Sequence, residues 1–479
     1  MVFSSSVFLF YFLPLFLICY FALPFKNLTL LVFSLFFYAW GEGLYVLLMI
    51  ASGLGNWAAA RWIAANSGSR SRARALLALG VALNLSGLFV FKYLGFFVES
   101  WNGILPAASL PVPQIHLPIG ISFFTFHATS YLVDVYRGDF KAERDPVKVL
   151  LYIAMFPQLI AGPIVRFGTV AKEIHERVVT LEKFALGLKF FIIGLGQKVL
   201  IANTLAVPVD AIYKIPAENL DAPLAWLAAV SYSLQIYFDF AGYSNMAIGL
   251  GLMIGIYFPL NFNYPYIAQS ITEFWRRWHI TLSTWLRDYL YIPLGGSRAG
   301  VYRTYFNLVV VFLLCGLWHG AKWTFVVWGL YHGFFLILER VGLAAALLRV
   351  GAEFRHLYAI LVVTVGWVFF RADDLSQASH HLQAMAGFGS GDGIAHHVWL
   401  HLQPDVALAL IIGALASTPY LVKLGERLVA AAGRWHGERR KVAHAVGGGL
   451  MSAALYLILL VSVISIASGN YNPFIYFRF

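Results

Sequence analysis

Charged residues are scarce in this chain. They make up 12% of its 479 residues, whereas hydrophobic residues make up 60%. An average soluble domain carries about 25% charged residues, so the composition predicts a protein solvated mainly by lipid. Apolar runs near the length that crosses a bilayer recur throughout the chain. They lie at about residues 5–23, 27–50, 75–98, 183–206, 224–258, 304–339, 355–371, 404–423 and 445–466.

Some of these runs are long enough for two elements, so we expect about ten to twelve membrane crossings. The sequence shows no repeat, no low-complexity linker and no composition shift that would mark a soluble domain. It therefore predicts an all-α polytopic membrane protein with a single membrane domain over residues 1–479. No basic residue precedes Lys26, which predicts that the first apolar run is a retained span instead of a cleaved signal.

Cysteine is also scarce. Cys19 and Cys315 both lie in apolar runs, and two distant cysteines suggest neither a metal site nor a disulfide framework. The chain lacks a G-x-S-x-G elbow, a Walker A motif, an H-E-x-x-H zinc helix and a G-x-G-x-x-G turn after a strand. The sequence therefore contains none of these motifs that would indicate a hydrolase, an ATPase or a dehydrogenase. We expect neither a bound cofactor nor a metal.

Acidic residues are fewer than basic ones, 23 against 34. This balance can indicate a nucleic-acid partner, but the basic residues sit in short loops, where the positive-inside rule explains them better. Segments 61–74, 137–148, 166–183 and 427–441 are therefore expected in the cytoplasm, with the amino terminus outside. The His-rich stretch 371–403 then lies outside. Its histidines lack the spacing of a zinc site, so we expect an ordinary loop, with metal binding as the alternative.

Two interruptions of the apolar pattern stand out. Between residues 118 and 170, prolines and glycines prevent long uninterrupted helices. Broken backbone at membrane depth is tolerated only where protein buries it or where it lines a wet cavity. This segment therefore predicts short, tilted or re-entrant helices around a central cavity. The segment 261–303 is the second candidate for re-entrant or interfacial helices.

Segment 261–303 is dense in aromatic and basic residues. Thr272 can start a helix in which Trp275, Trp278 and Leu282 share one face, typical of an amphipathic helix at the interface. The alternative is a belt that only anchors the protein. His279 at the end of the cluster favours a functional site. The candidates for substrate binding are Trp275, Arg276, Arg277, Trp278 and Arg287, together with Trp318 of the next motif.

Two histidines, His319 and His332, lie inside the apolar run 304–339. Ionisable side chains at such depth are costly and are functional candidates, although a histidine can also simply hydrogen-bond two helices. Gly316 and Gly320 flank His319 and allow a ligand to approach. A neutral buried imidazole can accept a proton, as a general base must. If 319–332 were one helix, His332 would lie about 20 Å further along the axis and would be structural or line an access path.

Six motifs together resemble the membrane-bound O-acyltransferase (MBOAT) superfamily, in the branch that O-acetylates bacterial exopolysaccharides such as alginate. The chain is similar, more distantly, to the membrane protein that D-alanylates teichoic acids. The motifs are 156–166 (FPQLIAGPIVR), 237–249 (YFDFAGYSNMAIG), 274–283 (FWRRWHITLS), 285–296 (WLRDYLYIPLGG), 317–320 (LWHG) and 472–479 (NPFIYFRF).

The resemblance implies a helical bundle around a central funnel in the bacterial inner membrane. There a cytoplasmic thioester, acetyl-CoA or an acyl carrier, would meet an acceptor from the other side. The essential histidine of the superfamily falls on His319, and the polar residue of its second motif falls on His279. Asp239 is a secondary candidate, for helix pairing or for the cavity. Asn245 stands where this branch is expected to carry Asp, so we assign no acidic role there.

The resemblance also implies a partner, a separate periplasmic acetyltransferase that modifies the polymer. The aromatic end 471–479 could dock this partner or anchor the chain at the membrane surface. Two alternatives remain open at this stage. One is a membrane acyltransferase with another acceptor, such as a teichoic acid, a lipid or a protein. The other is a transporter, against which stands the lack of visible inverted repeats.

Overall fold

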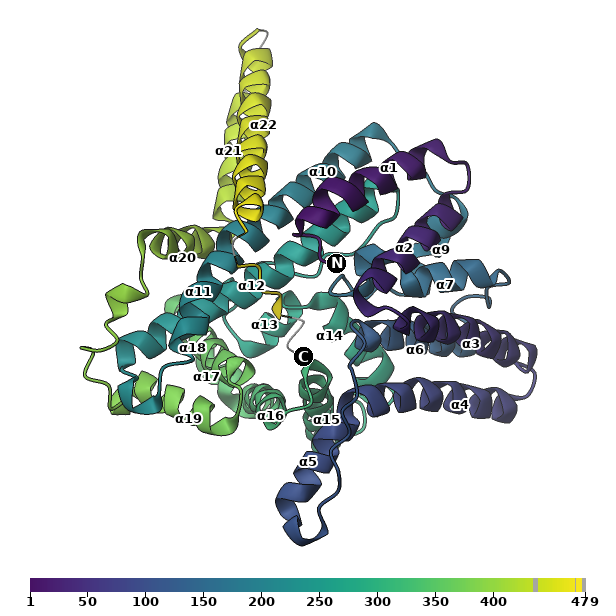
Figure 1. The fold of residues 1–479 in the computed structure, drawn as a ribbon, viewed down its shortest axis with the longest axis horizontal. Coiled ribbons are helices and arrows are strands. Elements are labelled where there is room, and N and C mark those ends of the chain that lie inside the picture. Colours follow the sequence, from purple (N-terminus) through teal and green to yellow (C-terminus); the bar gives the residue numbers. More distant parts are fainter. Residues whose placement is uncertain (434–437, 470, 476–479) are drawn as a thin grey trace.

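The protein is helical throughout the part described by the computed structural model, residues 1–433, 438–469 and 471–475. These residues form α-, 3₁₀- and π-helices joined by loops and no β-strand, which confirms the all-α prediction. Figure 1 shows most helices gathered around a centre that contains α13 (Ile271–Arg277) and α14 (Ile280–Leu286), with α21 (Tyr420–Gly433) and α22 (Glu438–Ala467) projecting away from it.

The amino-terminal part forms a group of helices on one side of this centre. Helices α3 and α4 pack against each other and against α6 (Ile121–Arg137), as Figure 1 shows. The π-helical turn η2 joins α4 to α5, which projects from the body. The helices of the group before residue 105 are η1 (Phe8–Phe12), α1 (Leu13–Ala22), α2 (Lys26–Glu42), α3 (Tyr45–Ala65), α4 (Arg70–Leu88), η2 (Phe89–Tyr93) and α5 (Leu94–Ile104).

The segment 118–170 folds into short helices, as its prolines and glycines predict. After α6 come α7 (Pro146–Ala154), α8 (Phe156–Leu159) and α9 (Phe167–His175). Asp145 caps α7 by accepting a hydrogen bond from the backbone N–H of Val147 at 2.9 Å. Every residue of α8 is buried. The broken backbone at α8 is therefore enclosed by protein, which is one of the two settings that membrane proteins tolerate for such backbone.

The long helix α12 (Ala222–Met253) is the central strut of the molecule. Most of the apolar run 224–258 lies in this single helix of 32 residues. It packs along α10 (Leu181–Gly196), the π-helix η4 (Gln197–Ala202) and α11 (Asn203–Ile212). Glycines bring the two backbones together: a Cβ on Gly249 would lie 2.5 Å from the carbonyl oxygen of Gly187. Small residues permit this approach between membrane helices.

The carboxyl-terminal half contains the hairpin that forms the site and the outer helices around it. The run 304–339 holds two helices, as expected. The helices are α15 (Val301–His319), α16 (Trp323–Leu338), α17 (Ala344–Leu347), α18 (Ala352–Arg371), α19 (Leu375–Gln383) and α20 (Pro404–Ala416), followed by α21 and α22.

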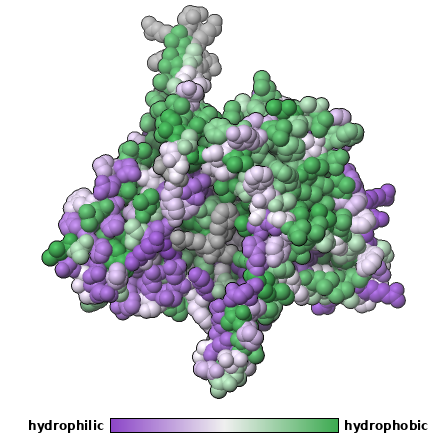
Figure 2. All heavy atoms as spheres, in the orientation of Figure 1, coloured by the Kyte–Doolittle hydropathy of each residue, from purple (hydrophilic) through white to green (hydrophobic). Residues whose placement is uncertain are grey.

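Seven helical segments of the described residues are long and apolar enough to cross a membrane, or eight if the bent pair α20–α21 counts as one span. Shorter apolar helices such as 8–22 add to these, so the count of ten to twelve crossings stays a prediction. Figure 2 shows hydrophobic residues over the α1 and α10 part of the visible face and hydrophilic residues at its left and right edges. This multi-span surface is that of a membrane protein.

The last described residues are held against α12 and η4 by a buried ion pair. Lys198 Nζ lies 2.6 Å from Asp239 Oδ1, and both side chains are at most 3% exposed. Asp239 Oδ2 accepts a hydrogen bond from the backbone N–H of Ile475 at 2.9 Å, and Lys198 donates to the carbonyl of Pro473. Asp239 therefore pairs two helices and also fixes the carboxyl-terminal segment 471–475.

We predict that Gly249→Ala destabilises the fold by about 1–3 kcal/mol, because the added methyl group would meet backbone and force α10 away from α12. Thermal unfolding in detergent, followed by tryptophan fluorescence, measures the effect. Gly55→Ala in α3 is the control, since its Cβ would meet nothing within 4 Å. Equal unfolding temperatures for both variants would contradict the close packing of these helices.

Asp239→Asn is expected to cost about 3–5 kcal/mol, because it leaves the buried Lys198 ammonium without its counter-charge. The double variant Lys198→Met with Asp239→Leu should recover most of this loss, since no charge is then buried unpaired. The free energy of unfolding in denaturant measures both variants. A double variant as unstable as Asp239→Asn would show that the pair's geometry, and not its charge balance, is what the fold needs.

Candidate functional site

His319 is the last residue of α15, where the chain turns back into α16. The two helices nearly touch: a Cβ on Gly316 would lie 2.2 Å from the carbonyl oxygen of Phe325, and one on Gly329 would lie 2.2 Å from that of Phe312. This approach brings Trp328 of α16 beside His319, with ring centroids 5.1 Å apart. The imidazole is only 5% exposed.

The helix break at His319 shows that the condition of one continuous helix through 319–332 does not hold. Because α16 runs back along α15, His332 does not lie a further three to four turns away along one axis. It packs against Trp328, at 5.2 Å between ring centroids, and Trp275 Nε1 donates to its Nδ1 at 3.4 Å. His332 and Trp275 thus form a buried support behind Trp328, the ring that contacts His319.

His279 lies at a second break in the chain. We expected one amphipathic helix through Trp275, Trp278 and Leu282, but α13 ends at Arg277 and α14 begins at Ile280. Between them His279 has φ 42°, a left-handed conformation that is rare for a residue with a side chain. The helix also begins one residue earlier than expected, with Ser270 as its cap, accepting from the N–H of Glu273. The strained backbone turns His279 into the protein.

Asn261 fixes the His279 ring. Its Oδ1 lies 3.0 Å from His279 Nδ1 and also accepts hydrogen bonds from Thr281. Since this oxygen accepts, Nδ1 carries the proton and Nε2 is left as a hydrogen-bond acceptor. Nε2 is buried without a partner among the described residues. Burial lowers the pKa of His279 to about 3, so the ring is neutral.

Trp318 links the two histidines. Its ring centroid lies 4.7 Å from that of His319 and 5.9 Å from that of His279. The other face of the group is closed by Phe126, which stacks on Trp318 at 5.4 Å and on Trp285 at 3.9 Å. The structure thus brings together two buried imidazoles that are 40 positions apart in the sequence, across one indole.

Cavities reach His319 from two directions. One, of about 260 Å³, is lined by Trp318 and His319 together with Lys92, His116 and residues 117–123 of the interrupted segment. The other is a narrow space of about 10 Å³ between His319, Trp278, Trp328, Trp367 and Phe370, and it extends to Ile475. His319 is therefore buried in the protein and borders a cavity large enough to admit a ligand group.

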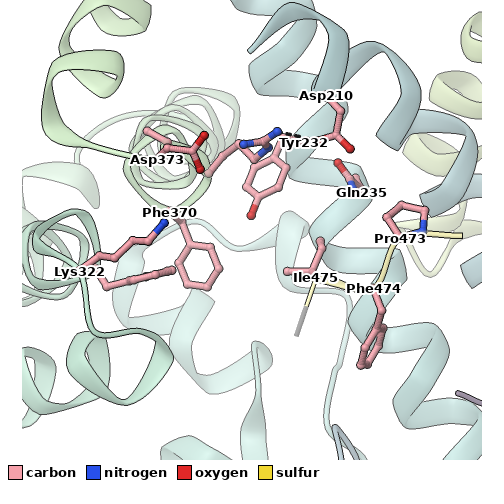
Figure 3. A pocket seen from close by; sticks show the side chains of 12 residues that line it. Asp210, Tyr232, Gln235, Lys322, Phe370, Asp373, Pro473, Phe474 and Ile475 are labelled. Carbon is pink, nitrogen blue, oxygen red and sulfur yellow. Dashed lines mark hydrogen bonds and ion pairs between the residues drawn. The ribbon is translucent and has the colours of Figure 1, made fainter. Parts of the chain in front are cut away.

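The narrow space borders a third pocket, of about 30 Å³, because Phe370 and Ile475 line both. Figure 3 shows this pocket, with Lys322, Phe370 and Asp373 at the left, Tyr232 near the middle, Asp210 and Gln235 at the right, and Pro473 to Ile475 below Gln235. Arg371 forms an ion pair with Asp210 at 2.5 Å, and Tyr471 donates to the same carboxylate at 2.7 Å. The side chains of Asp210, Lys322, Arg371 and Asp373 thus give this third pocket a charged lining.

The carboxyl-terminal segment was expected to dock a partner or anchor the chain. Of its residues, Phe474 and Ile475 are buried in the protein, next to the pockets described above. Tyr471 and Asn472, by contrast, are exposed, so docking and anchoring both stay predictions for this part of the segment. Residues 476–479 fall outside the described part of the chain.

The predicted arginines do not form one cluster. Arg276 is exposed at the end of α13, and Arg277 pairs with Glu273 at 2.8 Å. Arg287 pairs with Asp288 at 2.6 Å, and Arg166 contacts the same carboxylate. Burial opposes the ionisation of Asp288, but the guanidinium groups of Arg287 and Arg166 outweigh it and hold its pKa below the usual value.

Arg137 completes this second group, donating to the backbone carbonyl of Asp288 at 2.9 Å and lying 5.2 Å from the ring of Tyr289. The structure therefore gathers Arg137, Arg166 and Arg287. Sequence analysis assigned Arg137 and Arg166 only to the ends of cytoplasmic segments, because the contacts that unite the three arginines join segments about 120–150 residues apart.

Lys92 is the residue at this site that sequence analysis missed. It lines the 260 Å³ cavity together with His319. The signal was available, because Lys92 interrupts the apolar run 75–98 and an ionisable residue at such depth marks a functional candidate.

In the His-rich stretch 371–403, His381 is buried and stacks on Tyr213, with ring centroids 4.0 Å apart. Among the described residues, no group of three His, Cys, Asp or Glu side chains could hold a metal ion.

Comparison with known proteins identifies the family of the chain. The sequence model of the membrane-bound O-acyltransferase family matches residues 114–370, a range that contains both histidines. The chain is 42% identical to the probable alginate O-acetylase AlgI of Azotobacter vinelandii over the full length of both proteins. It is 37% identical to the peptidoglycan O-acetyltransferase of Helicobacter pylori, covering 83% of this chain and 81% of that one.

A more distant relative is the teichoic acid D-alanyltransferase of Bacillus subtilis, 32% identical over 46% of this chain and 60% of that protein. The relatives are thus acyltransferases by name, and the described residues supply the membrane spans and a buried pair of histidines within the matched range. The chain belongs to the membrane-bound O-acyltransferase family and is a membrane O-acyltransferase of the alginate O-acetylase type.

Proposed function

We propose that the protein moves an acetyl group from a cytoplasmic thioester, acetyl-CoA or an acyl carrier, across the bacterial inner membrane for the O-acetylation of an exopolysaccharide such as alginate. The single observation that carries this proposal is the position of His319, a buried imidazole that lines a cavity of about 260 Å³ within the protein. A thioester and an alcohol can meet at this base inside that cavity.

His319 acts as the general base. It takes the proton of the acceptor hydroxyl while the oxygen attacks the thioester carbonyl, and it returns the proton to the departing sulfur. The thioester is already activated, so a base and correct positioning supply much of the rate. His279 orients the donor, because its Nε2 is an acceptor that can hold an N–H group of the thioester's amide-containing arm.

The positions of the basic residues indicate that the thioester enters from the cytoplasmic side. Segments 61–74, 137–148 and 166–183 are basic and face the cytoplasm by the positive-inside rule. Arg137, Arg166 and Arg287 meet near Tyr289, with Arg276 and Arg277 on the preceding helix. Guanidinium groups bind phosphate through charge-assisted hydrogen bonds, so this surface fits the phosphates of coenzyme A. Trp278 and Trp318 line the inner cavities, where the acyl group is held.

The acetyl group then passes to a separate periplasmic acetyltransferase, which modifies the polymer. This relay is supported by the names of the relatives, since alginate and peptidoglycan are polymers too large for the cavities around His319.

A second polymer is also a candidate acceptor, and the experiment below tests both. The 37% identity to a peptidoglycan O-acetyltransferase favours peptidoglycan as the alternative polymer.

His319→Ala is expected to lower acetylation by about 10²–10⁴-fold, the usual contribution of a general base. Mass spectrometry of exopolysaccharide and of peptidoglycan from cells that carry the variant measures the loss and identifies the polymer. His380→Ala is the matched control, because His380 is an exposed histidine of α19. Size-exclusion chromatography in detergent should show both variants folded. Retained acetylation in His319→Ala would remove this residue from the mechanism.

Arg287→Gln is expected to raise the KM for acetyl-CoA about tenfold with little change in kcat, because one charge-assisted contact to phosphate is lost. Arg349→Gln, an exposed arginine before α18, is the control. With S-acetyl-N-acetylcysteamine, a thioester without phosphates, Arg287→Gln should match the unmodified protein. An equal loss with both donors would place Arg287 outside phosphate recognition.

A further inference from the structure

Lys92 lies at the carboxyl end of α15, one residue from the catalytic base. Its Nζ donates a hydrogen bond to the carbonyl oxygen of Trp318 at 2.5 Å and another to Ser122 Oγ at 3.4 Å. Lys92, Ser122, Trp318 and His319 line the same cavity. The side chain therefore brings a cation from η2, a distant segment of the chain, to the space in front of His319.

This cation has no carboxylate partner. Among the described residues no Asp or Glu oxygen lies within 4.0 Å of Lys92, whereas the equally deep Lys198 is paired with Asp239. Carbonyl groups at the end of a helix carry only a partial negative charge. A buried ammonium is costly unless it is compensated, so an anion that enters the cavity would stabilise the charged form of Lys92.

Capping α15 does not by itself require a charge. The neighbouring carbonyl of Leu317 accepts a hydrogen bond from the neutral hydroxyl of Tyr93 at 2.9 Å. A neutral donor would satisfy Trp318 in the same way and at lower cost. Neither histidine supplies the missing donor: His279 uses its N–H on Asn261, and His319 must begin the reaction as an acceptor. The negative charge that develops during thioester attack therefore has no other assigned partner at this site.

We propose that Lys92, assisted by the hydroxyl of Ser122, forms the oxyanion site of the reaction. This inference rests on the proposed thioester chemistry. As the acceptor oxygen bonds to the carbonyl carbon and His319 takes its proton, the carbonyl electrons move onto oxygen, which Lys92 stabilises. When the carbon–oxygen double bond re-forms, the carbon–sulfur bond breaks and sulfur takes the proton from His319. The cavity of about 260 Å³ has room for the acyl group, since about 150 Å³ admits benzene.

The anion could instead be a phosphate of the donor, the other source of negative charge. The two are separated by comparing acetyl-CoA with S-acetyl-N-acetylcysteamine, which carries the thioester without any phosphate. Thiol release by the full-length protein in nanodiscs gives kcat and KM for each donor. The unmodified protein and His319→Ala set the upper and lower limits of the rate.

Lys92→Met keeps the length of the side chain and removes its charge. We expect kcat to fall about 10²–10³-fold with both donors and KM to change less than about threefold, as for the loss of an oxyanion donor. Lys92→Arg, which keeps the charge, should retain at least tenfold more activity than Lys92→Met. Tyr93→Phe is the matched control: it removes the adjacent helix-end hydrogen bond and should leave kcat unchanged.

Three outcomes would overturn the proposal. Full activity of Lys92→Met beside an inactive His319→Ala would leave the thioester chemistry intact and exclude Lys92 from it. A defect confined to acetyl-CoA would assign Lys92 to a phosphate. An equal loss of kcat in Tyr93→Phe would show that only the end of α15 matters. If the unmodified protein released no thiol above His319→Ala, the proposed function itself would fail, together with this inference.

Discussion

A helix that ends inside an apolar protein leaves carbonyl groups that must find donors, and the centre of this molecule is built around one such end. α15 stops at His319, and its last carbonyls are taken by Lys92 and Tyr93 from a different segment of the chain. This arrangement supplies two things at once. It exposes an imidazole to a cavity, and it places a cation beside that imidazole.

The surroundings of this helix end are rigid. Gly316 and Gly329 let α15 and α16 approach until their backbones touch, and the aromatic rings of Trp318, Trp328 and Phe370 enclose His319. A second enclosed polar group, the Lys198–Asp239 pair, holds the carboxyl-terminal segment at the far side of the same space. Lys198 is paired with the carboxylate of Asp239, whereas Lys92 has no carboxylate partner among the described residues. For this reason we assign Lys198 a structural role and Lys92 a role in the reaction.

Several features of the fold and site followed from the sequence with good reason. The apolar runs predicted a helical membrane protein, and the prolines of 118–170 predicted the short helices α7 to α9. The motifs predicted the family, and the depth of His319 predicted its importance. Other features could not be predicted in this way. The left-handed backbone at His279 places the ring where its Nδ1 donates to Asn261, 18 positions earlier, a contact that a local amphipathic pattern does not contain. Nor could helical periodicity indicate that the arginines near Tyr289 come from three segments.

By itself, the sequence determined that the protein lies in lipid, that it is helical, which family it belongs to and which histidine lies at its centre. The length of the apolar runs, the positions of the prolines and the motifs are properties of short segments, so they can be recognised without the fold. Only the tertiary structure decided which side chains meet that histidine. The turn after His319 folds α16 back along α15 and places His332 against Trp328, and the contact of η2 with the end of α15 brings in Lys92. These contacts join residues as many as 226 positions apart, and their formation depends on how whole helices pack, which no local pattern encodes.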